Sequence, residues 1–308
     1  MQPFIDLSPY LPLLPRPYVF PIHPIIFPGS FNPAHVGHIA LANAACRIMA
    51  QKISTWQQER KLFIENRRIM ESEGNNHNNN NNNNRNNNQR FLDELWNKVD
   101  QHSFKEKGES LTVLFEMSLT NPDKPSMDPK EVARRVSLFH DASTRGAKEK
   151  GIINMPNDWG ILLTSAPLFI QKVQTFKKYL NSHANESSLL DKEEQYKEFT
   201  DINGIMPRMT FVIGTDTMLR IVNPKYYGGR DNMIEAVREM RNEGVHFVVG
   251  GRVEQGSDGG KRKRQAKFVS GLEELDDLPH DIQNMFTVMD EDEFRVDISS
   301  TELREGKV

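Results

Sequence analysis

Short apolar runs alternate along the chain with longer segments in which apolar residues recur every three or four positions. The short runs predict buried strands at about 24–27, 111–119, 159–166, 208–216, 245–251 and 286–290. The longer segments predict helices at 36–51, 90–101, 128–143, 167–180 and 232–244, with a short final helix at 299–306. Strands that alternate with helices indicate βαβ units with right-handed crossovers. The pattern therefore predicts an α/β fold with a mainly parallel sheet and helices on both faces.

Local signals support these boundaries. Asp128 and Pro129 are typical of a helix start, and Val132, Val136 and Phe139 then share one face. Gly244 is placed to end the helix at 232–244.

Two segments lack the composition of a packed core. Twelve of the fourteen residues from Asn75 to Asn88 are asparagine, so residues 74–90 predict a disordered Asn-rich insertion within the fold. Residues 1–23 contain six prolines and lack the basic start of a signal peptide, which favours an extended N-terminal arm. We therefore expect one domain over residues 24–308, preceded by the arm.

Composition argues against several function classes. The net charge of -3 argues against binding to bulk nucleic acid or to a membrane surface. No stretch approaches the ~20 consecutive apolar residues that a spanning helix needs. The single cysteine, Cys46, permits no intrachain disulfide, and we expect it to act as a small buried apolar residue. The expected location is cytoplasmic, with a nuclear signal in the basic segment 259–268 as the alternative to a solvated loop.

A donor-rich turn follows the first predicted strand. Residues 29–38 read GSFNPAHVGH, and the next helix begins near His35. Gly29 lets the backbone turn tightly and lets a ligand approach closely. His35 and His38 share one side of the first helical turn, where unpaired N–H groups also favour anions. This arrangement suits a polyphosphate. The alternatives are a turn with two surface histidines or a zinc pair, for which no third ligand is well placed.

A second donor cluster follows the last predicted strand. Ser299, Ser300 and Thr301 stand at the start of the final helix, and Arg304 follows three residues later. A capping box with Glu302 explains the hydroxyls without any ligand. The guanidinium of Arg304 can also bind a phosphate in bidentate geometry. Parallel sheets bind ligands beyond the carboxyl ends of their strands, so we expect both clusters to meet on one triphosphate.

The two motifs together resemble the nucleotidylyltransferase superfamily that carries the HxGH signature. They read G-S-F-N-P-x-H-x-G-H near the start and I-S-S-T-x-x-R near the end. Between them, residues 211–217 (FVIGTDT) and 164–176 (TSAPLFIQKVQTF) are similar to segments of the nicotinamide and nicotinate mononucleotide adenylyltransferases. The chain also resembles a eukaryotic cytidylyltransferase-like group often labelled with that activity. The resemblance covers roughly residues 25–304 outside the loops and implies a Rossmann-like sheet.

The resemblance also implies an activity and a site. AMP would pass from ATP to nicotinamide or nicotinate mononucleotide, giving NAD and pyrophosphate, with Mg²⁺ bound through the ATP phosphates and no direct metal site. The implied catalytic residues are His35, His38 and Arg304. The implied nucleotide-binding residues are Gly29, Ser30, Phe31, Gly37, Gly214, Asp216, Ser299, Ser300 and Thr301. Main-chain donors around Ser30 and Phe31 would face the α-phosphate, and the second cluster would hold the β- and γ-phosphates.

Several residues have two interpretations. Asp216 contacts a ribose hydroxyl by the resemblance, or caps a helix. For Phe169, we favour packing in the core over stacking on a pyridine ring. Tyr226 and Tyr227 line the acceptor side or belong to the core, and Asn32 is a candidate to reach the acceptor.

The sequence is also compatible with other functions. One is adenylyl or cytidylyl transfer to phosphopantetheine or a phospho-alcohol, and another is a catalytically silent nucleotide-binding protein of the same fold. The intact histidines and Arg304 argue against the silent protein. The expected partners are ATP and a mononucleotide acceptor, with no nucleic acid and no membrane. The sequence does not predict the oligomeric state.

Overall fold

The computed structural model describes residues 5–6, 24–74, 111–119, 127–148, 154–166, 168–184, 209–254 and 267–295. The predictions for the Asn-rich stretch, for the helix at 90–101 and for the motif at 297–306 lie outside these residues. The same holds for most of the N-terminal arm.

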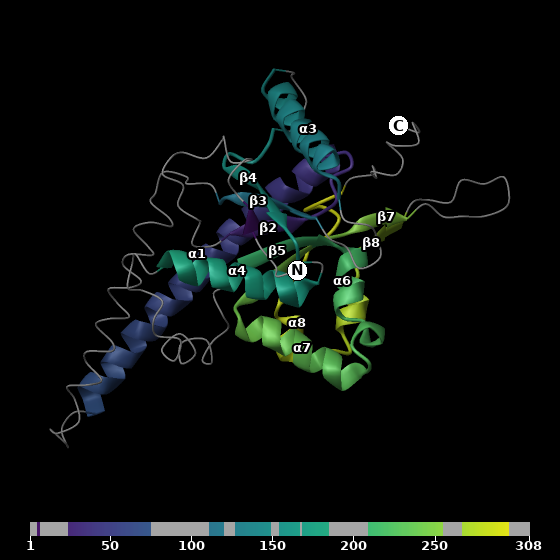
Figure 1. The fold of residues 1–308 in the computed structure, drawn as a ribbon. Coiled ribbons are helices and arrows are strands. Elements are labelled where there is room, and N and C mark those ends of the chain that lie inside the picture. Colours follow the sequence, from purple (N-terminus) through teal and green to yellow (C-terminus); the bar gives the residue numbers. More distant parts are fainter. Residues whose placement is uncertain are drawn as a thin grey trace.

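A twisted sheet forms the centre of the described part of the chain (Figure 1). Its strand order is β1-β4-β3-β2-β5-β6-β9, and among the described residues six strands run parallel. The parallel strands are β2 (Ile25–Pro28), β3 (Val113–Ser118), β4 (Trp159–Thr164), β5 (Met209–Gly214), β6 (Val245–Gly250) and β9 (Phe286–Val288). The two-residue β1 (Ile5–Asp6) pairs antiparallel with β4. The predicted α/β fold with a parallel sheet is confirmed.

The strand order reverses at β2. From β2 the chain adds β3 and then β4 on one side, and β5, β6 and β9 on the other. The junction of β2 and β5 is therefore the topological switch point, where the connections leave the sheet in opposite directions and open a crevice for ligands. The first donor-rich turn follows β2 directly, so the topology places it at this junction.

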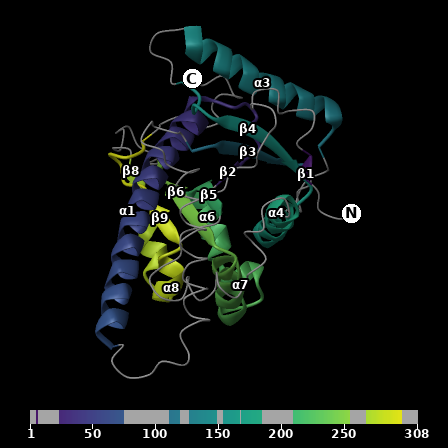
Figure 2. The ribbon, with the colours of Figure 1, turned by 90° about the vertical axis from the view of Figure 1, so that its left-hand side faces the viewer.

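Helices cover both faces of the sheet, as predicted. The first face carries α1 (Val36–Gly74) and α3 (Pro129–Lys148). The second face carries α4 (Phe169–Ala184), α6 (Thr215–Ile221), α7 (Arg230–Asn242) and α8 (His280–Gln283). Figure 2 shows α1 and α4 on opposite sides of the strands. Two single turns, η1 (Pro224–Tyr226) and η2 (Leu272–Leu275), and a hairpin of β7 (Arg252–Glu254) and β8 (Lys267–Val269) complete the described elements.

Each face has its own apolar cluster because successive strand residues point to opposite sides. Phe115 and Met117 of β3 join the cluster beneath α1 and α3, whereas Leu114 of the same strand joins the cluster beneath α4 and α7. Burial on both faces explains why the strands read as continuous apolar runs. The predicted inner face of α3 (Val132, Val136 and Phe139) is buried as expected. Gly244 follows the end of α7 with a φ of 76°, which confirms its predicted role.

No helix within the described ranges combines the length and the apolar character needed to cross a membrane.

One buried histidine lies in the central sheet. His246 of β6 is 5% exposed, and its Nε2 lies 2.7 Å from the Oγ1 of Thr287 on β9. Burial, with a smaller contribution from the charge of Lys52, lowers the pKa of His246 to about 3 from its usual 6.5. The folded protein therefore holds this imidazole neutral at pH values where the unfolded chain takes up a proton.

We expect the free energy of unfolding to fall as the pH decreases below 6.5. The unfolded chain binds the extra proton there, so each pH unit between 6.5 and about 3 costs about 1.4 kcal/mol at His246. Urea unfolding at pH 7 and pH 5 measures the difference. H246Q cannot titrate, and its glutamine amide can replace the hydrogen bond to Thr287. Between pH 7 and pH 5, the free energy of unfolding of this variant should fall by about 2 kcal/mol less than that of the wild type. An equal loss in both proteins would contradict the assignment.

Candidate functional site

The turn after β2 continues the sheet for one more residue. The N–H of Gly29 donates to the carbonyl of Glu116 on β3 at 2.9 Å. A Cβ at Gly29 would lie 2.7 Å from the ring of Phe31, a distance that real side chains do not reach. Gly29 is not among the glycines with positive φ. The ring of Phe31 therefore explains why position 29 is a glycine. The tight turn that we expected does not explain it.

Phe31 anchors the turn in the core. Its φ is 44°, a value that is rare for a bulky residue, and its side chain is only 1% exposed. Edge-on contacts with Phe27, Phe115 and Phe139, at centroid distances of 5.1–5.6 Å, hold the ring in place. The side chain thus points inward, and only the main chain of Phe31 is available to a ligand.

The two histidines of the turn lie together, as the sequence predicted. The ring centroids of His35 and His38 are 3.8 Å apart, and the ring of His38 also packs edge-on against Phe31 at 5.1 Å. Nδ1 of His38 accepts a hydrogen bond from the N–H of His35 at 3.3 Å, and Nδ1 of His35 accepts from the N–H of Gly37 at 3.1 Å. Since each Nδ1 accepts, each neutral ring carries its proton on Nε2.

Both imidazoles are neutral at physiological pH. Burial lowers the pKa of His38 to about 3, and the neighbouring His35 lowers it further in the same direction. Burial also lowers the pKa of His35. Within the described structure, Nε2 of His38 makes no hydrogen bond, and it is not among the buried unsatisfied atoms. The site therefore offers a neutral, accessible Nε2–H donor.

Three backbone N–H groups at the start of α1 are already paired within the turn. The N–H of Gly37 donates to the ring of His35, and the N–H groups of His38 and Ile39 donate to the carbonyl of His35 at 3.0 and 3.3 Å. The N–H groups of Gly37, His38 and Ile39 are therefore not free to bind an anion, and the expected anion site at this helix start stays a prediction. The side chain of His35 caps the helix, and the imidazole of His38 adds a side-chain donor.

The carboxyl end of β5 lies across the switch point. Gly214 ends the strand, and a Cβ built on it would meet nothing within 4 Å, so packing against the described residues does not explain a glycine here. Asp216 is exposed in the first turn of α6 and forms an ion pair with Arg252 of β7. The N-cap of α6 is Gly214, without a side-chain hydrogen bond, so the alternative of Asp216 as a helix cap is wrong.

The second donor cluster lies outside the described residues. The structure therefore does not place Ser299, Ser300, Thr301 or Arg304. Near residue 295 the described chain lies beside the end of β6. A Cβ on Gly250, at the end of β6, would lie 2.6 Å from Leu41 of α1 and 3.3 Å from Phe294. Phe294 also packs on the same apolar cluster as Phe31.

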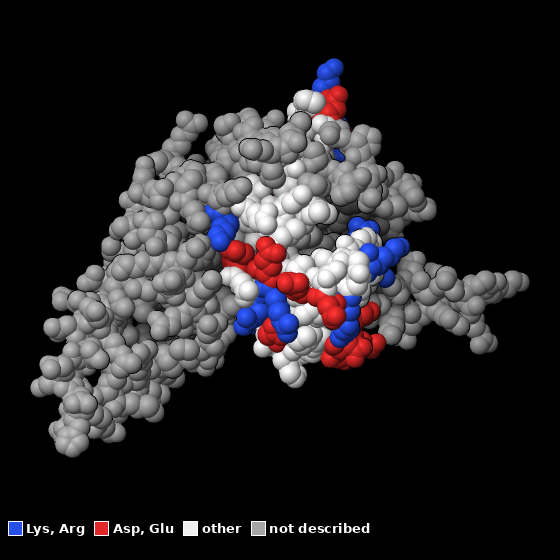
Figure 3. Space-filling model, turned by 60° about the horizontal axis from the view of Figure 1, so that its bottom comes forward, with Lys and Arg blue, Asp and Glu red and all other residues white. Residues whose placement is uncertain are grey.

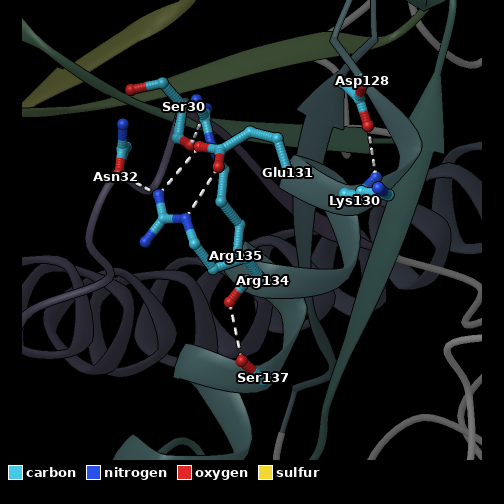
Figure 4. Close-up of polar contacts among 8 residues, drawn as sticks. All are labelled: Ser30, Asn32, Asp128, Lys130, Glu131, Arg134, Arg135 and Ser137. Atoms are coloured by element: carbon cyan, nitrogen blue, oxygen red, sulfur yellow. Dashed lines mark hydrogen bonds and ion pairs between the residues drawn. The ribbon is translucent and has the colours of Figure 1, made fainter.

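Sequence reasoning missed a polar group on α3. Nη1 of Arg135 donates to the carbonyl of Ser30 at 2.7 Å, and Nη2 of Arg134 donates to Oδ1 of Asn32 at 2.5 Å. Glu131 accepts from Nε of both arginines at 2.7 Å (Figure 4). The hydrogen bonds from Arg134 and then Arg135 lower the pKa of Glu131 to about 2. The spacing of these three residues marked an ordinary helix surface, and no pattern in the sequence placed them beside the turn.

The remaining aromatic candidates and the cysteine differ in their burial. Phe169 packs edge-on against Phe211 and Phe247 at 5.5 and 6.0 Å, in line with the core interpretation. Tyr227 is partly buried on the second face, whereas Tyr226 is 62% exposed. Cys46 packs on the first cluster, and burial raises the pKa of its thiol to about 12, which fits an apolar role.

One comparison bears on the segment that carries the turn. Residues 26–88 match the family model described as cytidylyltransferase-like, which belongs to the HxGH nucleotidylyltransferase superfamily. The matched segment begins in β2 and includes the turn, both histidines and all of α1. The match supports nucleotidyltransferase activity in general. Comparison with curated proteins found no match.

Proposed function

We propose that the protein transfers AMP from ATP to nicotinamide or nicotinate mononucleotide and releases pyrophosphate. The observation that carries the proposal is the pair of neutral imidazoles, 3.8 Å apart, at the switch point of a parallel sheet within the cytidylyltransferase-like segment. The choice of a pyridine mononucleotide rests on the similarity of residues 164–176 and 211–217 to the enzymes that use this acceptor.

The reaction needs donors and positioning but no base. An oxygen of the acceptor phosphate attacks the α-phosphorus of ATP, a new P–O bond forms, and the bond from the α-phosphorus to the bridging oxygen breaks. The nucleophile is already an anion, so no proton has to be removed. Nε2–H of His38 would donate to an α-phosphate oxygen as negative charge grows there. Arg304 and the hydroxyls of Ser300 and Thr301 would hold the departing β- and γ-phosphates.

We propose that Mg²⁺ binds through the phosphates of ATP. Within the described ranges, no three His, Cys, Asp or Glu side chains gather where they could hold a metal. Phosphate oxygens are the preferred ligands of Mg²⁺, which keeps several waters and few protein ligands in such sites. When bound, the ion neutralises charge on the triphosphate.

A product assay with a panel of acceptors tests the proposal. The protein is incubated with ATP or CTP and with nicotinamide mononucleotide, nicotinate mononucleotide, phosphopantetheine or phosphocholine, and pyrophosphate and the coupled product are measured. We expect release of pyrophosphate with ATP and a pyridine mononucleotide, matched by dinucleotide. Turnover restricted to another acceptor would contradict the pyridine assignment. Silence with every acceptor would favour a nucleotide-binding protein.

A further inference from the structure

Two arginines of α3 hold the outer side of the donor-rich turn. Phe31 is buried, whereas its neighbours Ser30 and Asn32 stay at the surface side of the turn. Arg135 binds the carbonyl of Ser30, and Arg134 binds the side chain of Asn32, as Figure 4 shows. Residues more than 100 positions apart thus meet at the turn that carries both histidines.

This cluster carries a net positive charge. Glu131 faces both guanidiniums, and its low pKa keeps it ionised throughout the physiological range. One carboxylate between two guanidiniums gives these three side chains a net charge of +1 beside the turn. A charge of this kind attracts an anionic group, and a guanidinium binds phosphate oxygens with directed hydrogen bonds.

The two arginines differ in exposure and in remaining donors. The side chain of Arg135 is 13% exposed and is held between Ser30 and Glu131, which suits a residue that fixes the turn. The side chain of Arg134 is 48% exposed. In the described structure, Nε and Nη2 of Arg134 make its hydrogen bonds to Glu131 and Asn32, and Nη1 makes none. Arg134 therefore has donors left for a ligand.

The strand order places Arg134 on the side of the turn that an incoming phosphate needs. The order β3-β2-β5-β6 puts α3, which follows β3, on one side of β2. Asp216, which the resemblance assigns to a ribose hydroxyl of the nucleotide, follows β5 on the other side of β2. In an in-line displacement the attacking and leaving oxygens stand on opposite sides of the α-phosphorus. With ATP held on the side of β5, the acceptor phosphate comes from the side of α3.

We propose that Arg134 binds the phosphate of the acceptor mononucleotide, and that Glu131 and Arg135 position it. This inference rests on the proposed function, since it assigns the acceptor side of that site. Asn32 is a residue of the turn, and its Oδ1 already accepts from Arg134, so the guanidinium lies directly beside the turn.

The test compares an acceptor with and without its phosphate. R134Q should raise the KM for nicotinamide mononucleotide about 10- to 100-fold, the range expected for a lost hydrogen bond to a charged group, and leave the KM for ATP unchanged. By calorimetry, R134Q should bind the mononucleotide more weakly by the same factor and bind nicotinamide riboside as the wild type does. R134K keeps the positive charge but lacks the planar, bidentate guanidinium, and it should recover part of the lost affinity for the mononucleotide.

Arg238 of α7 provides a matched control. It forms a similar exposed ion pair with Asp281 of α8, with Nε–Oδ2 at 2.8 Å. Both helices lie on the lower face, where acidic and basic side chains are interspersed (Figure 3). R238Q should change none of the constants.

Two results overturn the inference: an R134Q protein that keeps the wild-type preference for mononucleotide over riboside, or one that loses both ligands equally. A wild type that makes no dinucleotide refutes the proposed function. Calorimetry still reports whether binding of the mononucleotide depends on Arg134.

Discussion

Replacing His38 by alanine is expected to lower kcat by about 10²–10³-fold while the protein stays folded. The ring offers an accessible Nε2–H at the carboxyl end of β2, and its tautomer is held by the N–H of His35. A donor that is fixed before the reaction needs no rearrangement as charge develops on the α-phosphate, which is why its loss is costly. Pyrophosphate release under saturating ATP and acceptor measures the change.

The pH dependence separates a neutral donor from a charged one. An imidazolium would lose its extra proton, and with it the rate, as the pH rises through 6.5. The pKa of His38 is about 3, so its Nε2–H persists unchanged from pH 6 to pH 8. We therefore expect no decline of kcat across that range.

Exposed His280 on α8 is the matched control, and H280A should keep the wild-type rate. Circular dichroism of H38A should show the wild-type secondary structure. A wild-type kcat in H38A would refute the role of its imidazole.

The elements that build the site could be predicted because their signals are local. A buried apolar strand, a donor-rich turn and an apolar helix follow one another within residues 25–51, and β2 and α1 begin close to the expected positions. Val132, Val136 and Phe139 revealed the buried face of α3 by spacing alone. The approach of His35 to His38 also follows from spacing, because residues three apart share a side of a helix.

The remaining features depend on contacts between distant residues. Arg134 and Arg135 reach the turn across more than 100 residues, and the sequence around them shows only the pattern of a helix. The hairpin of β7 and β8 and the two-residue β1 are too short for a periodic signal. Gly29 looked like a tight-turn residue because only the structure shows the ring of Phe31 beside it.

A buried ion pair also escaped the sequence pattern. Glu116 stands in a strand that reads as apolar, yet it is 1% exposed and pairs with Lys172 of α4, which is 4% exposed. Nζ of Lys172 lies 2.7 Å from Oε1 of Glu116, and the hydroxyl of Thr164 donates to the same oxygen. In the described part of the chain, Oε2 of Glu116 has no hydrogen-bond partner.

We expect K172M to lower the free energy of unfolding by about 3–5 kcal/mol. Methionine fills a similar volume, so the main effect is a carboxylate that stays buried without its cation. Urea unfolding at pH 7 measures the change. The double variant E116Q/K172M should regain most of the loss, because an amide needs no counter-ion.

Lys177, on the same helix, is the matched control. It pairs with Glu243 at 2.9 Å, but the two side chains are 29% and 24% exposed. Partly exposed pairs contribute little because water solvates the remaining charge, so K177M should cost at most about 1 kcal/mol. A loss in K172M no greater than that in K177M would contradict a buried ion pair, since the carboxylate of Glu116 would then tolerate the absence of its cation.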